Sequence, residues 1–457
     1  MQKGVAMSGN ELKPGRSSNS RAQKHFMVGF VMGVLVVLTY LVVSQVSTIS
    51  AHYVVITAAQ WITAKEQVKA SGETEKVKVA CDTEGLYSET CELDGDVRTN
   101  GTTLSVNIVP ATQSEHREWR IQPYSRRTVS SINKVTVTQL PDRGAAAPCT
   151  VTHDVPAVLF ALGGHAGNFW HAFSDVLVPL FVASRRYDGE VLFLITNNQP
   201  WWLVKYDALV RRLSRHDPVD LDRDAEVRCF RHLTVGLRID KWFTVVPELA
   251  LGPGGRQRLT MADFTGLVRE AYELPRDAPT REPEKKPRLL LMHRGHSRQW
   301  LNEPEVQRAA EAAGFEVVVR EMPRYGPAKE QAQTVNSFDV LLGVHGAGLT
   351  HQLFLPPGGV LIQVVPFGKM ENISRSEYGE PATDMGLKYL DYSVSVEESS
   401  LPEMLGPDHQ VIRDPDSVHR SGWDMVNEFY LQKQHVRVDI ARFAPTLAQA
   451  YDHLRQL

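Results

Sequence analysis

The chain has 457 residues, of which 42% are hydrophobic and 23% are charged, and its formal net charge is -3. This composition excludes a largely disordered protein, and the length allows two domains with separate cores. The small net charge gives no overall attraction for nucleic acid, so we expect no nucleic-acid partner.

The first segments predict a membrane anchor. Residues 1–25 carry five basic side chains and one acidic side chain, which is typical of a cytosolic tail. Residues 26–44 contain no charge and approach the ~20 residues of a transmembrane helix. The basic flank predicts a type II signal anchor with a luminal carboxyl side, and a cleaved signal peptide is the alternative. Residues 45–78 predict a stem, and glycosylation sequons at Asn100 and Asn372 agree with a luminal location.

All four cysteines follow the apolar run. In an oxidising lumen they would form two disulfides, and of three possible pairings we favour Cys81 with Cys91 and Cys149 with Cys229, because the first pair closes a short loop. Four buried free thiols are the alternative. Metal binding is disfavoured, because no CxxC or paired histidine spacing accompanies them.

Residues 79–274 predict a first α/β domain. Apolar segments indicate strands at 104–109, 134–138, 158–162, 189–197 and 229–237. Apolar residues at helical spacing indicate helices from Gly167 to about Ser184, at 201–213 and at 260–274.

The start of the first of these helices carries polar residues on one strip. Asn168, His171 and Asp175 share it, and His171 and Asp175 are four apart and able to touch. Either Asp175 or His171 can serve as a general base that takes a proton from a substrate hydroxyl. A helix-capping Asn beside a satisfied surface His–Asp pair is the alternative.

Residues 275–287 include four prolines and predict a linker. Beyond it, strands at 288–293, 315–319, 340–344 and 360–365 alternate with helices at 303–313, 328–337 and 349–355. This alternation predicts a parallel sheet over residues 288–440, whose ligands lie beyond the carboxyl ends of the strands. Residues 416–430 predict a further helix, and residues 441–457 predict a C-terminal helix.

Two loops of this second domain follow strand ends. Arg294 and Arg298 follow the first strand, and guanidinium groups can fork onto phosphate oxygens. His345 to Thr350 follow the third strand, where Gly346 and Gly348 leave bare amides at a helix start that favours anions. Two solvated arginines and an ordinary tight turn are the alternatives.

Four motifs in order resemble glycosyltransferase family 61, whose plant members add pentoses to xylan or N-glycans in the Golgi. They are the cysteine segment ending in GDVR at 95–98, GGHAGNFWHAFSDVLVPLF at 163–181, LLLMHRGHSRQWLNEPE at 289–305 and VHGAGLTHQLFLPPGGVLIQVVP at 344–366. The chain departs from the family pattern in four places: Leu86-Tyr87 replaces charged residues between the two cysteines, Ala172 replaces an acid, His293 a serine and His351 an asparagine.

The resemblance implies a GT-B fold, in which two Rossmann-like α/β domains face a cleft behind one N-terminal transmembrane helix. It implies an inverting Golgi transferase that moves arabinofuranose or xylose from a UDP-sugar to the xylan backbone. The implied site comprises catalytic Asp175 and His171, acceptor-binding Asn168 and Trp170, and donor-binding Arg294, Arg298, His345, Gly346, Ala347, Gly348, Leu349 and Thr350. No cofactor or metal is expected. Expected partners are the donor, a glycan acceptor, the Golgi membrane and other wall-synthesis transferases.

Several alternatives stay open. A GT-A fold would need a metal-binding DxD, and Asp220–Asp222 or Asp222–Asp224 match those letters. Family members also xylosylate N-glycans, and animal relatives transfer GlcNAc to protein. Ala172 and His351 favour a different class, a carbohydrate-binding scaffold without catalysis.

Overall fold

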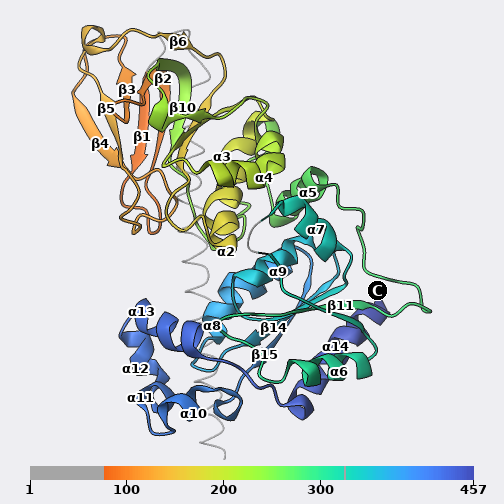
Figure 1. Ribbon diagram of the computed structural model, residues 1–457. Coiled ribbons are helices and arrows are strands. Elements are labelled where there is room, and N and C mark those ends of the chain that lie inside the picture. The colour runs from red at the N-terminus through yellow and green to blue at the C-terminus, as the bar shows by residue number, and fades with distance from the viewer. Residues whose placement is uncertain (1–76, 324–325) are drawn as a thin grey trace, which may run out of the picture. The chain divides into compact units, whose positions relative to one another are not determined.

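The computed structural model describes residues 77–323 and 326–457. The predicted tail, the predicted anchor and all but the last two residues of the predicted stem lie outside these ranges. Within them, every helix is too short or too polar to cross a bilayer. The described residues belong to one compact unit that contains two β-sheets (Figure 1).

The first sheet has ten strands among the described residues. Eight follow the order β4-β5-β3-β2-β10-β7-β8-β9, while β1 pairs with β2 and β6 with β10. The strands are β1 (Lys78–Asp82), β2 (Thr90–Asn100), β3 (Ser105–Val109), β4 (Arg117–Ile121), β5 (Val135–Gln139), β6 (Val151–Thr152), β7 (Ala157–Ala161), β8 (Leu192–Thr196), β9 (Val219–Asp220) and β10 (Val227–Val235).

This sheet is mixed rather than purely parallel. Strands β10, β7, β8 and β9 run parallel, whereas β2 pairs antiparallel with β1, β3 and β10. The sequence predicts β3, β5, β7, β8 and β10 but misses β1, β2, β4 and the two-residue strands β6 and β9. Strand β2 contains Gly95 with a φ of 136° and alternates charged with apolar residues, which hides it among turn signals.

Two disulfides stabilise this sheet, in the pairing that the sequence favours. Cys81–Cys91 joins neighbouring strands β1 and β2, whose Cα atoms pair in register. Cys149–Cys229 connects the segment before β6 to β10, across 80 residues of chain. Closing loops of this kind stabilises a fold chiefly by restricting the unfolded chain.

The predicted helix from Gly167 to Ser184 exists, but it is interrupted. It comprises α2 (Phe169–His171), a π-helical turn η2 (Ala172–Leu177) and α3 (Val178–Ser184). Such π turns inside α-helices are frequent at functional sites, and this one contains Asp175. The other long helices of the first half are α4 (Pro200–Leu213) and α5 (Met261–Tyr272), as predicted.

The second sheet has five parallel strands in the order β12-β11-β13-β14-β15 (Figure 1). They are β11 (Arg288–Met292), β12 (Glu316–Arg320), β13 (Val340–Val344), β14 (Val360–Val365) and β15 (Lys388–Ser393). The chain leaves β11 toward one edge and returns to β13 on the other side. In sheets with this order the ligand site lies at the point of reversal, beyond the carboxyl ends of β11 and β13.

Alternate residues of this sheet enter different cores. Leu290 and Leu341 face a core shared with α7 (Ala328–Asn336) and α9 (Glu380–Asp384). Leu289 and Leu342 face a second core with α6 (Glu303–Ala312) and the C-terminal helix α14 (Ile440–Gln456). The sequence analysis assigned the last helix to residues 441–457, and it packs on this second sheet.

Shorter helices complete the second half. They are η6 (Ala347–Phe354), α8 (Glu371–Ser374), a π turn η7 (Arg375–Gly379), α10 (Leu401–Leu405), α11 (Gln410–Arg413), α12 (Pro415–Arg420), α13 (Trp423–Val426) and a π turn η9 (Asn427–Lys433). The helix predicted at 416–430 is therefore broken, at Gly422 with a φ of 103°. Short 3-10 turns occur at 143–145, 185–187, 221–223, 253–255 and 396–398.

One continuous core connects the two sheets. It includes β7 and α3 of the first half, α5, and the face of the second sheet covered by α7. The predicted linker 275–287 contains no helix or strand and is fastened by Arg276, whose Nη2 lies 2.6 Å from Oδ1 of buried Asp339. The domain boundaries at this linker stay predictions.

Candidate active site

Three adjacent strands of the second sheet place polar residues at one edge. Arg294 and Arg298 follow β11, His345 and Gly346 follow β13, and Glu377 lies in η7, which follows β14. Because the strands are parallel and neighbouring, their carboxyl ends meet.

The two arginines touch the glycine turn. A Cβ atom added to Gly346 would lie 2.9 Å from Nη1 of Arg294 and 3.1 Å from Nη2 of Arg298. The φ of Gly346 is 142°, a conformation that side chains rarely adopt. Glycine is therefore required here both by the backbone conformation and by the guanidinium groups beside it. The two loops that the sequence predicts for the ligand site are thus in contact.

Neither of these arginines forms an ion pair within the described residues, although Glu321 acts on the pKa of Arg294 and Glu377 on that of Arg298. Arg298 is 8% exposed, its Nε has no hydrogen-bond partner in the described chain, and Nε of Arg294 donates to the carbonyl of Ser297 at 2.8 Å. Burial and the charge of Arg294 lower the pKa of Arg298 to about 9, which leaves it charged at neutral pH. Burying an unpaired cation costs roughly several kcal/mol, so the pair is suited to an anionic ligand.

His345 completes this cationic edge as a neutral donor. It is 2% exposed, and burial together with Arg298 and Arg294 lowers its pKa well below the usual value. Nε2 of Gln363 donates to Nδ1 of His345 at 2.8 Å, and the hydroxyl of Tyr389 donates to Oε1 of Gln363 at 2.9 Å. In this arrangement the ring proton of His345 is on Nε2, on the side of Glu377.

The rest of the predicted donor loop forms the start of η6. Ala347 and Gly348 are half-buried, and their amides open the helix. Leu349 and Thr350 are buried, so their side chains face the core. Donor binding by these four residues stays a prediction.

His351, a departure from the family pattern, has a structural role. Its Nδ1 donates to the carbonyl of Gly348 at 2.8 Å, and its ring stacks on Phe169 with centroids 4.5 Å apart. Burial lowers its pKa to about 4, so the ring is neutral and packs without a charge. The residue fastens the glycine loop to the start of α2.

Asp175 lies at the centre of a second group, in the π turn η2. Its Oδ2 accepts hydrogen bonds from the hydroxyl of Tyr124 at 2.9 Å and from Nε of Arg126 at 2.7 Å, and Nδ1 of His171 lies 2.7 Å away. Burial alone would raise the pKa of Asp175, but hydrogen bonds and charge from His171 and Arg126 outweigh it, so this pKa is lowered. Burial raises the pKa of Tyr124, which keeps its hydroxyl a donor.

This geometry divides the roles of His171 and Asp175. The carboxyl of Asp175 is fully buried and ionised, and three donors surround one of its oxygens. The side chain of His171 is 22% exposed, and its contact with Asp175 occupies Nδ1. Asp175 thus holds the ring through Nδ1 and leaves Nε2 as the ring nitrogen that can accept a proton, and catalysis by either residue stays a prediction.

Direct contacts join the two groups. The indole Nε1 of Trp170 donates to the backbone carbonyl of Glu377 at 3.3 Å, and Phe169 stacks on His351. The charges of Arg126 and Arg298 also lower the pKa of Glu377, and the charge of Asp175 raises it. The base candidate and the cationic edge thus belong to one site.

The predicted acceptor residues have structural contacts. Oδ1 of Asn168 caps α2 by accepting from the amide of Trp170 at 2.9 Å, which is the alternative considered for the sequence. Trp170 is 5% exposed, and its ring lies below the guanidinium of Arg126. Acceptor binding by these two residues stays a prediction.

The sequence analysis missed Tyr124, Arg126 and Glu377. Tyr124 and Arg126 lie in a loop between β4 and β5, distant in sequence from every motif. The SEYGE segment around Glu377 has neither a helical stripe nor a strand pattern. A single sequence contains no signal that would connect these residues with Asp175 or His345.

The DxD letters do not form an open ligand set. Oδ1 of Asp222 accepts from the hydroxyl of Thr196 at 2.6 Å and Oδ2 from the amide of Asn198 at 2.9 Å, while Oδ2 of Asp220 accepts from Nδ2 of Asn198. These carboxylates hold the loop after β8 to the end of β9 and the turn that follows it.

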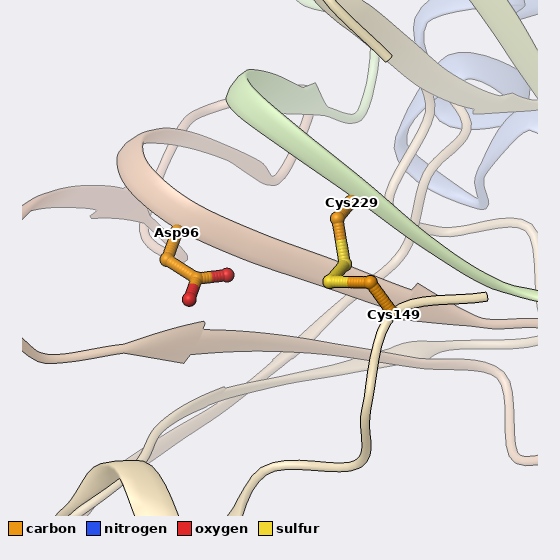
Figure 2. A group of neighbouring side chains, drawn as sticks. All are labelled: Asp96, Cys149 and Cys229. Carbon is orange, nitrogen blue, oxygen red and sulfur yellow. A yellow bond between two sulfur atoms is a disulfide. The ribbon is translucent and has the colours of Figure 1, made fainter. Parts of the chain in front are cut away.

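One other group of potential ligand atoms occurs in the described residues. Asp96 lies beside Cys149 and Cys229 (Figure 2). The two sulfur atoms are bonded to each other, so they are not available as the thiolate ligands that a metal requires. Asp96 instead forms an ion pair with Arg98 at 2.7 Å.

The chain is similar to known proteins over most of its length. A family model described as glycosyltransferase 61 matches residues 169–362. The chain is 40% identical to alpha-1,3-arabinosyltransferase XAT3 of Oryza sativa subsp. japonica over 412 residues, which cover 88% of this chain and 70% of the relative. It is 39% identical to beta-1,2-xylosyltransferase XYXT1 of the same plant, with 82% and 84% covered. It is 33% identical to xylan glycosyltransferase MUCI21 of Arabidopsis thaliana, with 84% and 81% covered.

Proposed function

We propose, from the premise that this chain belongs to glycosyltransferase family 61, that it transfers a pentose from a UDP-sugar to the xylan backbone. Membership makes the protein a glycosyltransferase. The similar plant proteins are named as arabinosyl- and xylosyltransferases, one of them a xylan glycosyltransferase, which supports arabinofuranose or xylose as the transferred sugar.

One observation supports the donor class most strongly. Arg294 and Arg298 are unpaired cations that touch Gly346 at the point where the second sheet reverses its strand order. Such an edge favours a diphosphate, because guanidinium groups and helix-start amides bind its oxygens. The guanidinium charge would stabilise UDP as it leaves, so we propose a reaction that needs no divalent ion.

The reaction would proceed by direct displacement with inversion. Nε2 of His171 takes the proton of an acceptor hydroxyl while that oxygen attacks the anomeric carbon. The bond from this carbon to the diphosphate breaks, and UDP departs toward Arg294 and Arg298. Asp175 stays ionised and stabilises the protonated imidazole, as the carboxylate does in other His–Asp pairs.

The fold and location follow as further proposals. We assign the chain to the GT-B class, with the acceptor side in residues 79–274 and the donor side in residues 288–440. We propose a type II Golgi membrane protein with a luminal catalytic region. The two disulfides support this location, because such bonds form in oxidising compartments. Protease protection of tags at each end, together with a Golgi marker, tests it.

Turnover of the purified full-length protein tests the function. The protein is incubated in detergent with UDP-arabinofuranose or UDP-xylose and with xylo-oligosaccharides, and UDP release and products are measured. We expect release that depends on both substrates and a pentosylated oligosaccharide. Transfer to an N-glycan acceptor instead would replace xylan as the substrate. Oligosaccharide binding without turnover of any donor would overturn the enzyme assignment in favour of a scaffold.

A further inference from the structure

Glu377 has an unused carboxyl group inside the site. It lies in the π turn η7, between α8 and α9, and its side chain is 21% exposed. Its carboxyl forms no hydrogen bond with the described residues, and Nε2 of the neutral His345 lies 3.6 Å from its Oε2. Neighbouring acids differ: Glu380 pairs with Lys241 at 2.9 Å, and Asp384 accepts from Thr244 at 2.6 Å.

Glu377 lies between the cationic edge and the group around His171 and Asp175. His345 belongs to the cationic edge, and the ring of Tyr378, the next residue, meets His345 edge-on at 5.4 Å. On the other side, the backbone carbonyl of Glu377 accepts from Trp170, the residue before His171. A sugar bonded to a diphosphate at Arg294 and Arg298, with its anomeric carbon directed toward His171, would lie against this carboxyl.

We infer that Glu377 binds hydroxyl groups of the transferred sugar and selects the donor by their arrangement, an inference that rests on the proposed function. A carboxyl group presents two oxygens that can form hydrogen bonds, so it can hold two adjacent hydroxyls at once, whether it is ionised or protonated. UDP alone has no group at this position. Glu377 would therefore discriminate between UDP-sugars while contributing little to the binding of UDP.

Binding measurements separate this role from a structural one. The affinities of the full-length protein for UDP and for UDP-xylose are measured by calorimetry, in the wild type and in Glu377→Gln. We expect the substitution to change UDP affinity less than about threefold and to abolish most of the added affinity of the sugar. Loss of a substrate hydroxyl contact costs up to ~10⁴-fold in kcat/KM, so we expect kcat/KM for the donor to fall at least about 10²-fold.

Two further variants complete the test. Glu371→Gln, on the exposed first position of α8, is the matched control and is expected to behave as the wild type. Glu377→Asp keeps the charge but shortens its reach, and we expect it to change the relative use of UDP-arabinofuranose and UDP-xylose. An equal loss of UDP and UDP-xylose affinity in Glu377→Gln would assign the residue to the fold instead. Unchanged sugar affinity and donor preference would overturn the inference.

This experiment distinguishes the inference from the proposed function. If the wild-type protein turns over no UDP-pentose, the proposed function fails. The ratio of UDP to UDP-sugar affinity, measured with UDP-xylose, UDP-glucose and UDP-GlcNAc, then still decides whether Glu377 contacts a sugar. A ratio that Glu377→Gln leaves unchanged for all three donors contradicts the inference in that case as well.

Discussion

The two sides of the site differ in whether their buried charges form ion pairs. At the edge of the second sheet, Arg298 is buried beside Arg294, and neither forms an ion pair within the described residues, although the Glu377 carboxyl is close enough to act on the pKa of Arg298. In the first half, Arg126 donates to Asp175, which also accepts from Tyr124 and contacts His171. The group around Oδ2 of Asp175 holds one ring in a fixed orientation, whereas the arginines at the sheet edge retain a charge for a ligand. The protein therefore pairs its buried charges where they orient a side chain, and it leaves a buried charge without an ion pair where a ligand would bind.

The largest effect is expected from His171, the partly exposed member of the group around Asp175. His171→Ala should lower kcat by about 10² to 10⁴-fold, since that is the usual contribution of a general base. UDP affinity should stay unchanged, because the imidazole lies on the acceptor side. The measurements are UDP release and UDP calorimetry, with His216→Ala, at a half-exposed histidine paired with Glu190, as control. Full activity in His171→Ala would reassign the base.

Arginine substitutions sharpen the comparison between paired and unpaired cations. Arg298→Met should weaken UDP binding by about 1.5 to 3 kcal/mol, the usual value of hydrogen bonds to charged groups. It should also raise the melting temperature without ligand, because an uncompensated buried charge is removed. Arg276→Met removes the cation paired with buried Asp339, which keeps hydrogen bonds from Thr280 and Arg288, so it should lower the free energy of unfolding by about 3 kcal/mol and leave UDP affinity unchanged.

Thermal unfolding measures the stability of both arginine variants, and calorimetry measures their affinity for UDP. Destabilisation by Arg298→Met to the same extent as by Arg276→Met would mean that the pair at the sheet edge is structural. The comparison between the two sides of the site would then lose its basis.

The third prediction concerns pH. Burial raises the pKa of Glu377 to about 7, above the usual 4.5, so the folded protein favours the protonated carboxyl. Its contribution to stability is therefore fully present below about pH 4.5 and is lost as pH rises through about 7, a difference of about 3 kcal/mol at most. Glu377→Gln should be more stable than the wild type above pH 7, and this advantage should vanish toward pH 4.5.

Denaturant unfolding of ligand-free protein between pH 4.5 and 8 measures this difference. Glu371→Gln is again the matched control, and it should follow the wild type at every pH. A constant difference between Glu377→Gln and the wild type would show that the carboxyl is not held in the protonated form.

The smallest expected effect is that of chelation. If guanidinium groups neutralise the diphosphate, EDTA should leave kcat/KM unchanged, and added Mn²⁺ should not raise it. Asp222→Asn should then alter stability rather than activity, because its carboxylate holds Thr196 and Asn198. Strict dependence on a divalent ion, lost in Asp222→Asn, would favour the metal-dependent alternative.

Local patterns predict most of the second half. Runs of branched apolar residues separated by amphipathic helices identify β11 to β14, and their lengths agree with the structure to within about two residues. The same reasoning finds the two loops of the cationic edge, because in parallel sheets ligand loops follow the strands. It misses β15, whose residues alternate exposed and buried positions at the edge of the sheet.

The first half is less predictable from sequence. Antiparallel strands β1, β2 and β4 contain charged and turn-forming residues, and their pairing depends on partners far along the chain, as in β2 with β10. The π turn at 172–177 is also invisible to a helical pattern, although it decides which way Asp175 faces. Propensity is local, whereas these features depend on tertiary contacts.

The sequence by itself determined the family, the order of strands and helices in residues 288–365, and the identity of His171, Asp175, Arg294 and Arg298 as site candidates. Motif residues and hydrophobic periodicity are local properties, so one chain suffices to find them. Only the tertiary structure decided that Asp175 is buried and orients His171, and that Arg126, Tyr124 and Glu377 join them. Burial and the pairing of charges depend on which distant segments pack together, and no stretch of sequence contains that information alone.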